Sequence, residues 1–292
     1  MSVHDSAVLV TGAAGFIGAA VAEALMARGQ AVIGIDNMND YYPVSLKRAR
    51  LDRVGVRFGN LFQFRELDFA DMHALSAGLE DQRFGAIIHL GAQAGVRYSL
   101  ENPQAYVASN LAGHVNMLEL ARAREVRHMV YASSSSVYGG NTKLMSETYA
   151  HLFRIPLTGL RFFTVYGPWG RPDMAMWKFA DRILSDRPID VYNHGEMHRD
   201  FTYIDDIVGG VLACLDRPPA DDGEEKAGGI CRHHRTHPRH RLCALDPDRR
   251  RRPALRGMVP QLSRAVTGRA TGLDLTPLGF KGRTEFDRTR FA

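Results

Sequence analysis

The chain has 292 residues, of which 45% are hydrophobic and 24% charged, as in ordinary globular proteins. This length allows one large domain or two small ones with a sizeable core. No apolar run approaches membrane-spanning length, and the start MSVHDSAVLV lacks the pattern of a signal peptide, so neither a membrane protein nor a secreted one is expected. Three cysteines make no disulfide framework, which favours a reducing, cytoplasmic compartment.

The net charge of +5 is unevenly distributed. Residues 230–292 contain 14 Arg and 1 Lys against 5 acidic residues, a net charge of +10, so residues 1–229 carry a net charge of −5. The basic character therefore belongs to the tail alone.

The first predicted unit is a strand, a glycine-rich turn and a helix, within the string AVLVTGAAGFIG. Ala7–Val10 is a short apolar run typical of a strand buried on both faces, and Phe16–Arg28 has apolar residues at helical spacing. The turn glycines Gly12, Gly15 and Gly18 let a pyrophosphate approach the free N–H groups at the helix start. A glycine-rich turn without a ligand is the alternative.

A second apolar run, Ala31–Ile35, ends in Asp36, eighteen residues past Gly18. A carboxylate at this place accepts hydrogen bonds from both ribose hydroxyls and repels a 2′-phosphate. Strand, turn, helix, strand and terminal carboxylate together predict a dinucleotide site that prefers NAD over NADP.

Further along, short apolar runs alternate with helical patterns up to residue 165. After an excursion over Met38–Val56, the predicted elements are a strand at Phe64–Leu67, a helix at Asp71–Asp81, a strand at Ala86–Leu90, a helix at Pro103–Arg124, and strands at His128–Ala132 and Leu157–Phe162. This order predicts an α/β fold with a doubly wound parallel sheet covered by helices. The apolar stripe of the long helix comprises Val107, Leu111, Val115, Leu118 and Ala121.

Five strings occur in the order TGAAGFIG, HLGAQAGVRYS, YASSSSVYG, RFFTVYGPWGRPDM and RDFTYIDDI. Together they resemble the extended short-chain dehydrogenase/reductase superfamily, in its NAD-dependent epimerase/dehydratase branch. AQAGVRYS and the loop around Arg171 are most similar to UDP-glucuronate 4-epimerases. The resemblance spans about residues 7–229. It implies an NAD-binding domain at 1–165 and a partial nucleotide-sugar-binding region at 166–229, followed by an atypical tail at 230–292.

The resemblance implies interconversion of UDP-glucuronate and UDP-galacturonate through a 4-keto intermediate, with a hydride passed to NAD and returned on the other face. Ser134, at the end of the fifth strand, would hold the C4 hydroxyl, with Ser135 beside it at the substrate. The alternative is a serine run that caps backbone groups. Thr164 and Arg171 would face the sugar carboxylate and Arg199 the diphosphate, whereas pairing of Arg171 with a surface acid is its alternative.

On the cofactor side, the resemblance adds contacts from Phe16, Ile17, Asn37, Asp68, Phe69, Leu90, Gly91 and Ala92. Asp68 and Phe69 would contact adenine, although an Asp after a strand also suits a helix cap. Asn110 is expected to brace the sheet, and Asp205 and Asp206 to cap the next helix.

The catalytic base of this family is a Tyr four residues before a Lys, which lowers the pKa of the phenol. None of the ten tyrosines here has Lys at the fourth residue on. Gly140–Leu144 resembles the loop that leaves the fifth strand, and Met145–Arg154 resembles the second half of the catalytic helix. We expect the segment between them to be missing, so that the chain has lost its base or the sequence omits a segment. Tyr149 is a candidate substitute, on a part of the helix that packs beyond the site.

The tail from Ile230 has few aromatic or β-branched residues, so weak packing is expected. Its Arg, Pro and His content fits a coding segment read in a shifted frame. The residues that could bind zinc are Cys231, His233, His234, His237, His240 and Cys243. Their spacing matches no familiar zinc finger. Nucleic-acid binding through Arg249–Arg252 is the other alternative, but no aromatic residues are interleaved with these arginines. A solvated segment is therefore favoured for the tail, and no metal site is predicted.

The sequence therefore predicts a nucleotide-sugar epimerase whose activity is put in doubt by the missing Tyr and Lys. A catalytically inactive NAD-binding remnant is the first alternative, and a metal or nucleic-acid binder acting through the tail is the second. The expected partner is a UDP-sugar, and relatives imply a homodimer.

Overall fold

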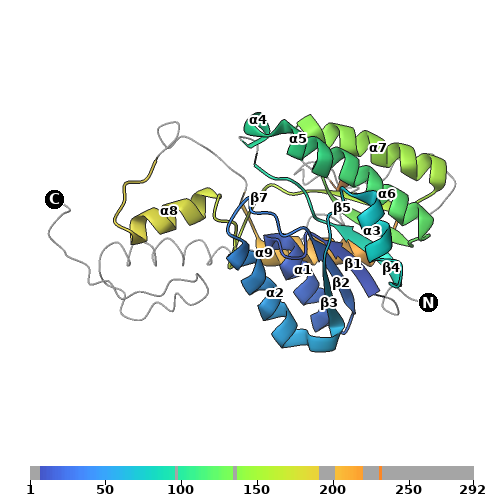
Figure 1. Cartoon of the computed structure of the whole chain (residues 1–292), viewed down its shortest axis with the longest axis horizontal. Helices are drawn as coiled ribbons and strands as arrows, with labels where there is room; N and C mark the ends of the chain where they lie inside the picture. The colour runs from blue at the N-terminus through green and yellow to red at the C-terminus, as the bar shows by residue number, and fades with distance from the viewer. Residues whose placement is uncertain (1–6, 96–97, 134–136, 191–200, 220–229, 232–292) are drawn as a thin grey trace, which may run out of the picture. The chain divides into compact units, whose positions relative to one another are not determined.

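A computed structural model describes residues 7–95, 98–133, 137–190, 201–219 and 230–231 of the chain (Figure 1). Ser134, Ser135, Arg199 and the tail after Cys231 lie outside the described residues. Residues 7–165 form one compact unit with the described residues between 200 and 231, and residues 166–190 belong to another.

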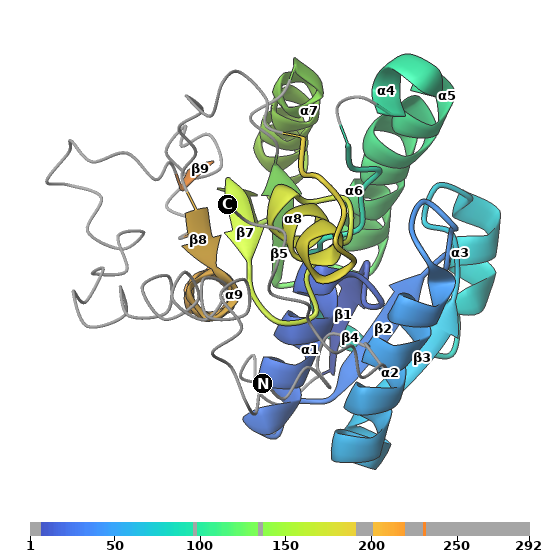
Figure 2. The same ribbon diagram turned by 90° about the vertical axis from the view of Figure 1, so that its left-hand side faces the viewer.

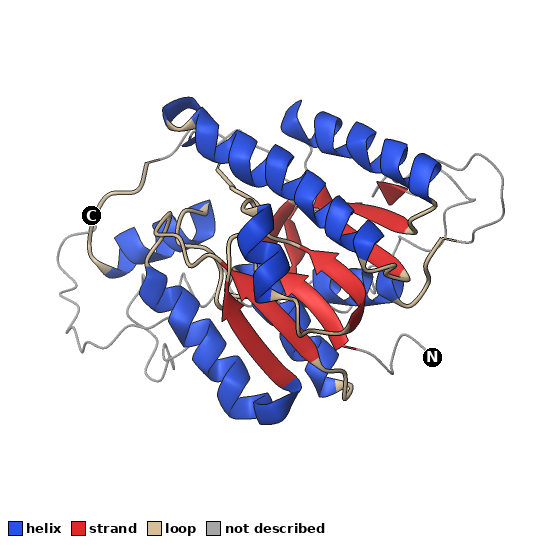
Figure 3. Ribbon diagram, turned by 45° about the vertical axis from the view of Figure 1, so that its right-hand side comes forward, coloured by secondary structure: helices blue, strands red, loops and turns tan. Residues whose placement is uncertain are grey.

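The first unit is built on a parallel sheet in the order β3-β2-β1-β4-β5-β6-β9. Its strands are β1 (Ala7–Thr11), β2 (Val32–Asp36), β3 (Phe62–Glu66), β4 (Phe84–His89), β5 (His128–Ser133), β6 (Leu157–Arg161) and β9 (Ile230–Cys231). Helices cover both faces of this sheet (Figure 3), which confirms the predicted doubly wound α/β fold. The strand order reverses between β1 and β4, and in such sheets ligands bind at the carboxyl ends of the strands beside this reversal.

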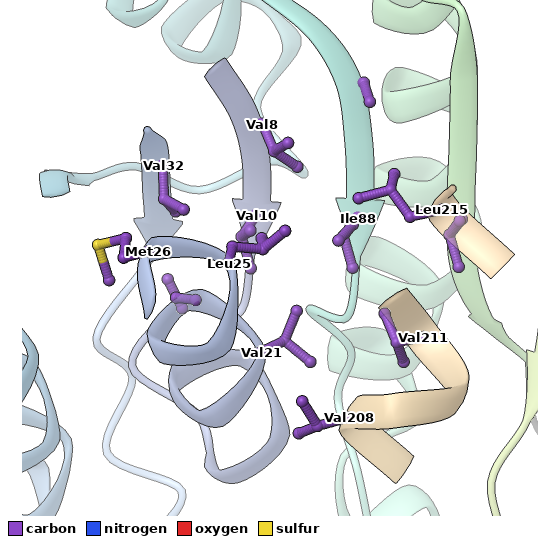
Figure 4. Packing of buried hydrophobic residues seen from close by; sticks show 14 of the residues in the cluster. Val8, Val10, Val21, Leu25, Met26, Val32, Ile88, Val208, Val211 and Leu215 are labelled. Carbon is purple, nitrogen blue, oxygen red and sulfur yellow. The ribbon is translucent and has the colours of Figure 1, made fainter. Parts of the chain in front are cut away.

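Two apolar cores lie on the two faces because successive side chains of a buried strand point in opposite directions. Val8 and Val10 of β1 pack against helices α1 (Phe16–Ala27) and α9 (Ile204–Leu215) on one face (Figure 4). Leu9 points to the other face, which is covered by α3 (Met72–Gly78), α6 (Gly113–Ala123) and α7 (Val137–Phe153). A strand buried on both sides in this way explains the continuous apolar run in the sequence.

The predicted helix over Pro103–Arg124 is helical but not uniform. It consists of α5 (Pro103–Tyr106), the π-helical turn η3 (Val107–Ala112) and α6, preceded by the short helix α4 (Tyr98–Glu101). Leu118 and Ala121 are buried as predicted, but Val107 is 42% exposed. A π-helical turn contains more residues than an α-helical one, so its residues do not keep the α-helical spacing of the stripe, and the predicted stripe is wrong at Val107.

Helix α7 begins at Val137, so the predicted loop at Gly140–Leu144 is wrong. The residues GNTKL continue into the helix although Gly and Asn are weak helix formers. Packing supports the helix here: Thr142 is buried, its carbonyl oxygen accepts from Ser146 Oγ, and Ser146 bonds to buried His114 of α6. Tertiary contacts here override a weak local preference.

The two-stranded sheet of β7 (Thr164–Tyr166) and β8 (Phe201–Tyr203) is visible in Figure 2, and β8 leads directly into α9. The N-cap of α9 is Tyr203, so the predicted caps Asp205 and Asp206 lie in the first turn instead, where their charges complement the helix dipole. Ile230 and Cys231 pair with β6. Helix α8 (Ala175–Leu184) belongs to the second unit.

No helix within the described part of the chain has both the length and the apolar character needed to cross a bilayer.

Candidate nucleotide-binding site

Two positions of the turn between β1 and α1 admit only glycine. Gly12 has a φ of +68°, and a Cβ there would lie 2.9 Å from Cα of Gly91. A Cβ at Gly18 would lie 2.0 Å from the carbonyl oxygen of Gly12. Among the described residues, no side chain caps α1 at its N-cap, Gly15. A tight turn that leads to an uncapped helix N-terminus, which includes Phe16 and Ile17, fits a diphosphate.

We predict that Gly18→Ala weakens both folding and NAD binding. Because the added methyl group meets backbone, the turn must shift, and such overpacking costs about 1–3 kcal/mol. Thermal unfolding and calorimetric NAD titration measure the two effects. Gly55→Ala is the matched control, since a Cβ at Gly55 meets nothing within 4 Å. Equal behaviour of the two variants would contradict the role of the turn.

Asp36 ends β2 beside this turn and is 7% exposed. Its Oδ1 accepts hydrogen bonds from the backbone N–H of Met38 at 2.9 Å and from Lys47 Nζ at 3.2 Å. Its Oδ2 accepts one from the backbone N–H of Ala14 at 3.3 Å. These donors hold the carboxylate against the turn, where the sequence pattern predicts the adenosine ribose. A carboxylate has about four acceptor positions, so capacity remains for a ribose hydroxyl.

Two buried cations next to Asp36 were missed by the sequence analysis. Both lie on α2 (Val44–Phe58), one turn apart. Lys47 Nζ also donates to Asn39 Oδ1 at 3.1 Å, and Arg50, which is fully buried, donates from Nη1 to the carbonyl oxygen of Ala14 at 3.0 Å and to Tyr42 Oη at 2.8 Å. With buried Val54, the two cations occupy the helical spacing that an apolar stripe would use. The sequence signal that could have revealed Lys47 and Arg50 is their helical spacing with the apolar residue Val54, which places all three on one face of the helix.

Asn37 and Asp68 connect the ends of β2 and β3. Asn37 Nδ2 donates to Asp68 Oδ2 at 3.1 Å, and Asp68 Oδ1 accepts from the backbone N–H of Ala70 at 2.8 Å. The N-cap of α3 is Asp71, whose side chain accepts from the N–H of Ala74. The helix-cap alternative for Asp68 is therefore wrong, and Asp68 is exposed.

Phe69 is 5% exposed, and its ring packs edge-on against His89, with the ring centroids 5.1 Å apart. Its ring also lies against Gly91 and Gly113, where a Cβ would come within 2.6 Å of ring atoms. The Phe69 side chain is thus part of the core, and only its backbone remains for the predicted adenine contact.

The predicted cofactor-bordering residues Leu90, Gly91 and Ala92 follow β4. Thr11 Oγ1, at the end of β1, accepts from the N–H of Gly91 at 2.9 Å and bonds to His89 Nδ1 at 2.8 Å. This hydroxyl ties β1 and β4 together at the point where the strand order reverses.

Asn110, predicted to brace the sheet, instead holds the loop that follows β4. Its Oδ1 accepts from the N–H of Gln93 at 2.8 Å, and its Nδ2 donates to the carbonyl oxygen of Gln93 at 3.0 Å. The pair of bonds positions this loop from the π-helical turn η3.

Behind the carboxyl ends of the strands lie two buried imidazoles, His89 and His114, with ring centroids 5.5 Å apart. Burial lowers the pKa of His114 to about 4. Burial and, secondarily, the neighbouring His114 hold the pKa of His89 well below its usual value. His114 Nε2 bonds to Ser146 Oγ at 2.8 Å, and this hydroxyl donates to the carbonyl oxygen of Thr142. Both rings are therefore neutral parts of the core at neutral pH.

Tyr149, the candidate substitute for the missing base, donates its hydroxyl to Glu119 Oε1 at 2.6 Å. This bond, together with partial burial, raises the pKa of Tyr149, which makes its phenolate harder to form. Lys143 of the same helix pairs with Glu147 at 3.3 Å. The structure thus ties these side chains of α7 to acidic partners on α6 and α7.

On the substrate side, Thr164 is half-buried on β7. In the second unit, Arg171 Nε donates to Asp173 Oδ1 at 2.9 Å, and Nη2 pairs with Asp173 Oδ2. This is the pairing with a nearby acid that stood as the alternative for Arg171.

The model of the NAD dependent epimerase/dehydratase family matches residues 8–152 and 142–226 of the chain. The chain is 46% identical to "Protein CapI" of Staphylococcus aureus over 241 residues, which cover 74% of this chain and 71% of that protein. It is 47% identical over 238 residues to a "Probable UDP-glucuronate 4-epimerase" of Rhizobium meliloti, with 73% and 69% covered.

Among solved structures, the chain is similar to UDP-glucuronic acid 4-epimerase from Bacillus cereus in complex with UDP-glucuronic acid and NAD. The TM-score is 0.67 and the identity 32%, with 76% of each chain covered. The family match extends over most of the chain and agrees with the fold, the glycine turn and the position of Asp36. The chain therefore belongs to the NAD dependent epimerase/dehydratase family.

Proposed function

We propose that the chain interconverts UDP-glucuronate and UDP-galacturonate through a 4-keto intermediate, and that it does so slowly because the family's Tyr and Lys are missing. The main support for NAD binding is the position of Asp36, whose carboxylate accepts hydrogen bonds from three donors beside the glycine turn. The relatives named as UDP-glucuronate 4-epimerases support the substrate.

In this proposal, residues 1–165 hold NAD and residues 166–229 contribute to the nucleotide-sugar site. NAD, when bound, supplies the hydride acceptor. The glycine turn and the start of α1 hold its diphosphate, and Asp36 holds the adenosine ribose. Ser134 donates to the sugar oxygen at C4, next to Ser135, and Arg199 contacts the diphosphate of the UDP-sugar.

Thr164 and Arg171 would face the sugar carboxylate. Because Arg171 is paired with Asp173 through Nε and Nη2, a substrate carboxylate that takes this edge of the guanidinium would replace Asp173. An Arg–carboxylate pair exchanged for another of the same geometry retains its two parallel hydrogen bonds.

Two observations support a missing segment. The alignment with the Staphylococcus aureus relative is 241 positions long, but it covers only 74% of the 292 residues of this chain, which is fewer than 241 residues. The aligned region of the relative therefore contains residues that this chain lacks. The two stretches matched by the family model overlap at residues 142–152, within α7. The tyrosine and lysine of the family motif would belong to the lost segment.

A turnover assay tests the proposal. Purified chain with NAD and UDP-glucuronate is expected to form UDP-galacturonate far more slowly than the usual enzyme rate of about 10 s⁻¹. Turnover at ordinary rates would contradict the role of the missing base. Complete inactivity together with NAD binding would favour the second candidate, an NAD-binding remnant. The bonds of Tyr149 to Glu119 and of Lys143 to Glu147 support this candidate.

We predict that NAD raises the thermal midpoint of the chain whereas NADP barely changes it. A ligand present at 100 times its Kd stabilises the folded state by about 2.7 kcal/mol. Asp36 accepts from a ribose hydroxyl but leaves no room for a 2′-phosphate. Thermal unfolding at equal concentrations of the two cofactors measures the difference. The reverse order would remove Asp36 from its role.

A further inference from the structure

Lys47 lies at the adenosine-ribose end of the site with its charge already satisfied. Its Nζ is 3.2 Å from Asp36 Oδ1, and the side chains of Lys47 and Asp36 are 5% and 8% exposed. An ammonium this deeply buried needs an anionic partner, because water cannot solvate it. Asp36 is that partner in the structure.

Lys47 is also held in place. Its Nζ donates to Asn39 Oδ1 at 3.1 Å and lies 5.3 Å from the centre of the Tyr42 ring. Arg50, one turn further along α2, lies 5.4 Å from the centre of the same ring. The ammonium therefore cannot follow a departing partner into solvent without breaking these contacts.

The 2′-oxygen of an adenosine ribose held by Asp36 lies within a hydrogen bond of the Asp36 carboxylate. A phosphate on that oxygen would fall where the carboxylate lies, one contact from Lys47 Nζ. In the native chain Asp36 both fills this space and takes up the positive charge. A chain without the carboxylate would present an unpaired, immobilised cation at the same point.

We propose that Lys47 is a specificity-determining residue for the cofactor. Asp36 keeps the site selective for NAD both by filling the space of the phosphate and by occupying Lys47, and once the carboxylate is removed, Lys47 binds the 2′-phosphate of NADP. This inference rests on the proposed function to the extent that the site binds a dinucleotide.

The experiment measures the Kd of NAD and of NADP calorimetrically for the native chain, Asp36→Ser, Lys47→Gln and the double variant, at pH 8 and constant salt. Asp36→Ser is expected to bind NADP at least about tenfold more tightly than the native chain, since charge-assisted contacts to a phosphate exceed neutral ones. The double variant is expected to lose this gain. Arg57→Gln is the matched control, because it removes a positive charge from an exposed position of the same helix.

A gain in NADP affinity that persists in the double variant would overturn the inference, and so would no gain in Asp36→Ser. If Asp36→Ser fails to fold, Lys47→Gln alone decides. It is expected to raise the ratio of the NADP Kd to the NAD Kd, because Asp36 without its ammonium partner repels a 2′-phosphate more strongly, and an unchanged ratio overturns the inference. Failure of every variant and of the native chain to bind either cofactor would instead overturn the proposed function. NAD binding by the native chain without the Lys47 effects would leave that function standing.

Discussion

If the proposed function holds, insertion of a segment with a Tyr four residues before a Lys should raise the turnover of UDP-glucuronate by about 10²–10⁴-fold, the usual contribution of general acid–base catalysis. The segment would be inserted between Leu144 and Met145 of the chain. The inserted residues would then form the first half of the catalytic helix, and Gly140–Leu144 would return to a loop. Formation of UDP-galacturonate under saturating substrate measures the gain.

The control is the same insertion with Phe in place of its Tyr, which keeps the length and the helix but removes the proton-accepting oxygen. This control is expected to remain as slow as the native chain. Equal turnover of the two insertions would show that the base is not what the chain lacks. NAD titration of both chains separates a catalytic gain from a change in cofactor binding.

Acidification should destabilise the chain strongly between pH 6.5 and pH 4. The pKa of His114 is about 4 in the folded chain against 6.5 as its ordinary value, so the unfolded chain binds a proton in this window and the folded chain does not. The stability present above pH 6.5 is therefore lost as the pH falls towards 4, by about 3 kcal/mol for His114. His89, whose pKa is also lowered by burial, acts in the same direction. Urea unfolding at a series of pH values measures the slope.

His114→Gln keeps a polar group near Ser146 but removes the titrating ring, so its stability should depend less steeply on pH. His73→Gln is the matched control, since His73 is an exposed residue of α3. A native slope in His114→Gln would assign the acid sensitivity to other groups.

The sequence predicted those parts of the fold and site that depend on local spacing. A buried strand, a turn of glycines, a helix and a carboxylate at the end of the next strand follow one another within residues 7–36, and nothing distant is needed to place Asp36 near Gly12. The parallel order of the sheet likewise follows from the alternation of apolar runs and helical patterns.

Features set by tertiary contacts were predicted less well. The sequence analysis made no prediction for Lys47 and Arg50, which bond to Asp36 and to the carbonyl oxygen of Ala14 because α2 packs against the turn. Gly140–Leu144 has a loop-like sequence but is helical in α7, where Thr142 is buried and accepts from Ser146, which bonds to His114 of α6. Phe69 was predicted from a resemblance between strings, which indicates its position along the chain but not that its ring points into the core.

The π-helical turn at Val107–Ala112 lets one continuous helical segment serve two different surfaces. Each residue of an α-helix is rotated by about 100° from the one before it, so one extra residue changes the direction of everything on its far side by about that angle. On one side of the turn, α6 presents Met117 and Leu118 to the sheet. Within the turn, Asn110 reaches Gln93 in the loop beside the strand reversal. Loss of a single residue from this segment would realign the two surfaces and leave the helix able to hold only one of them.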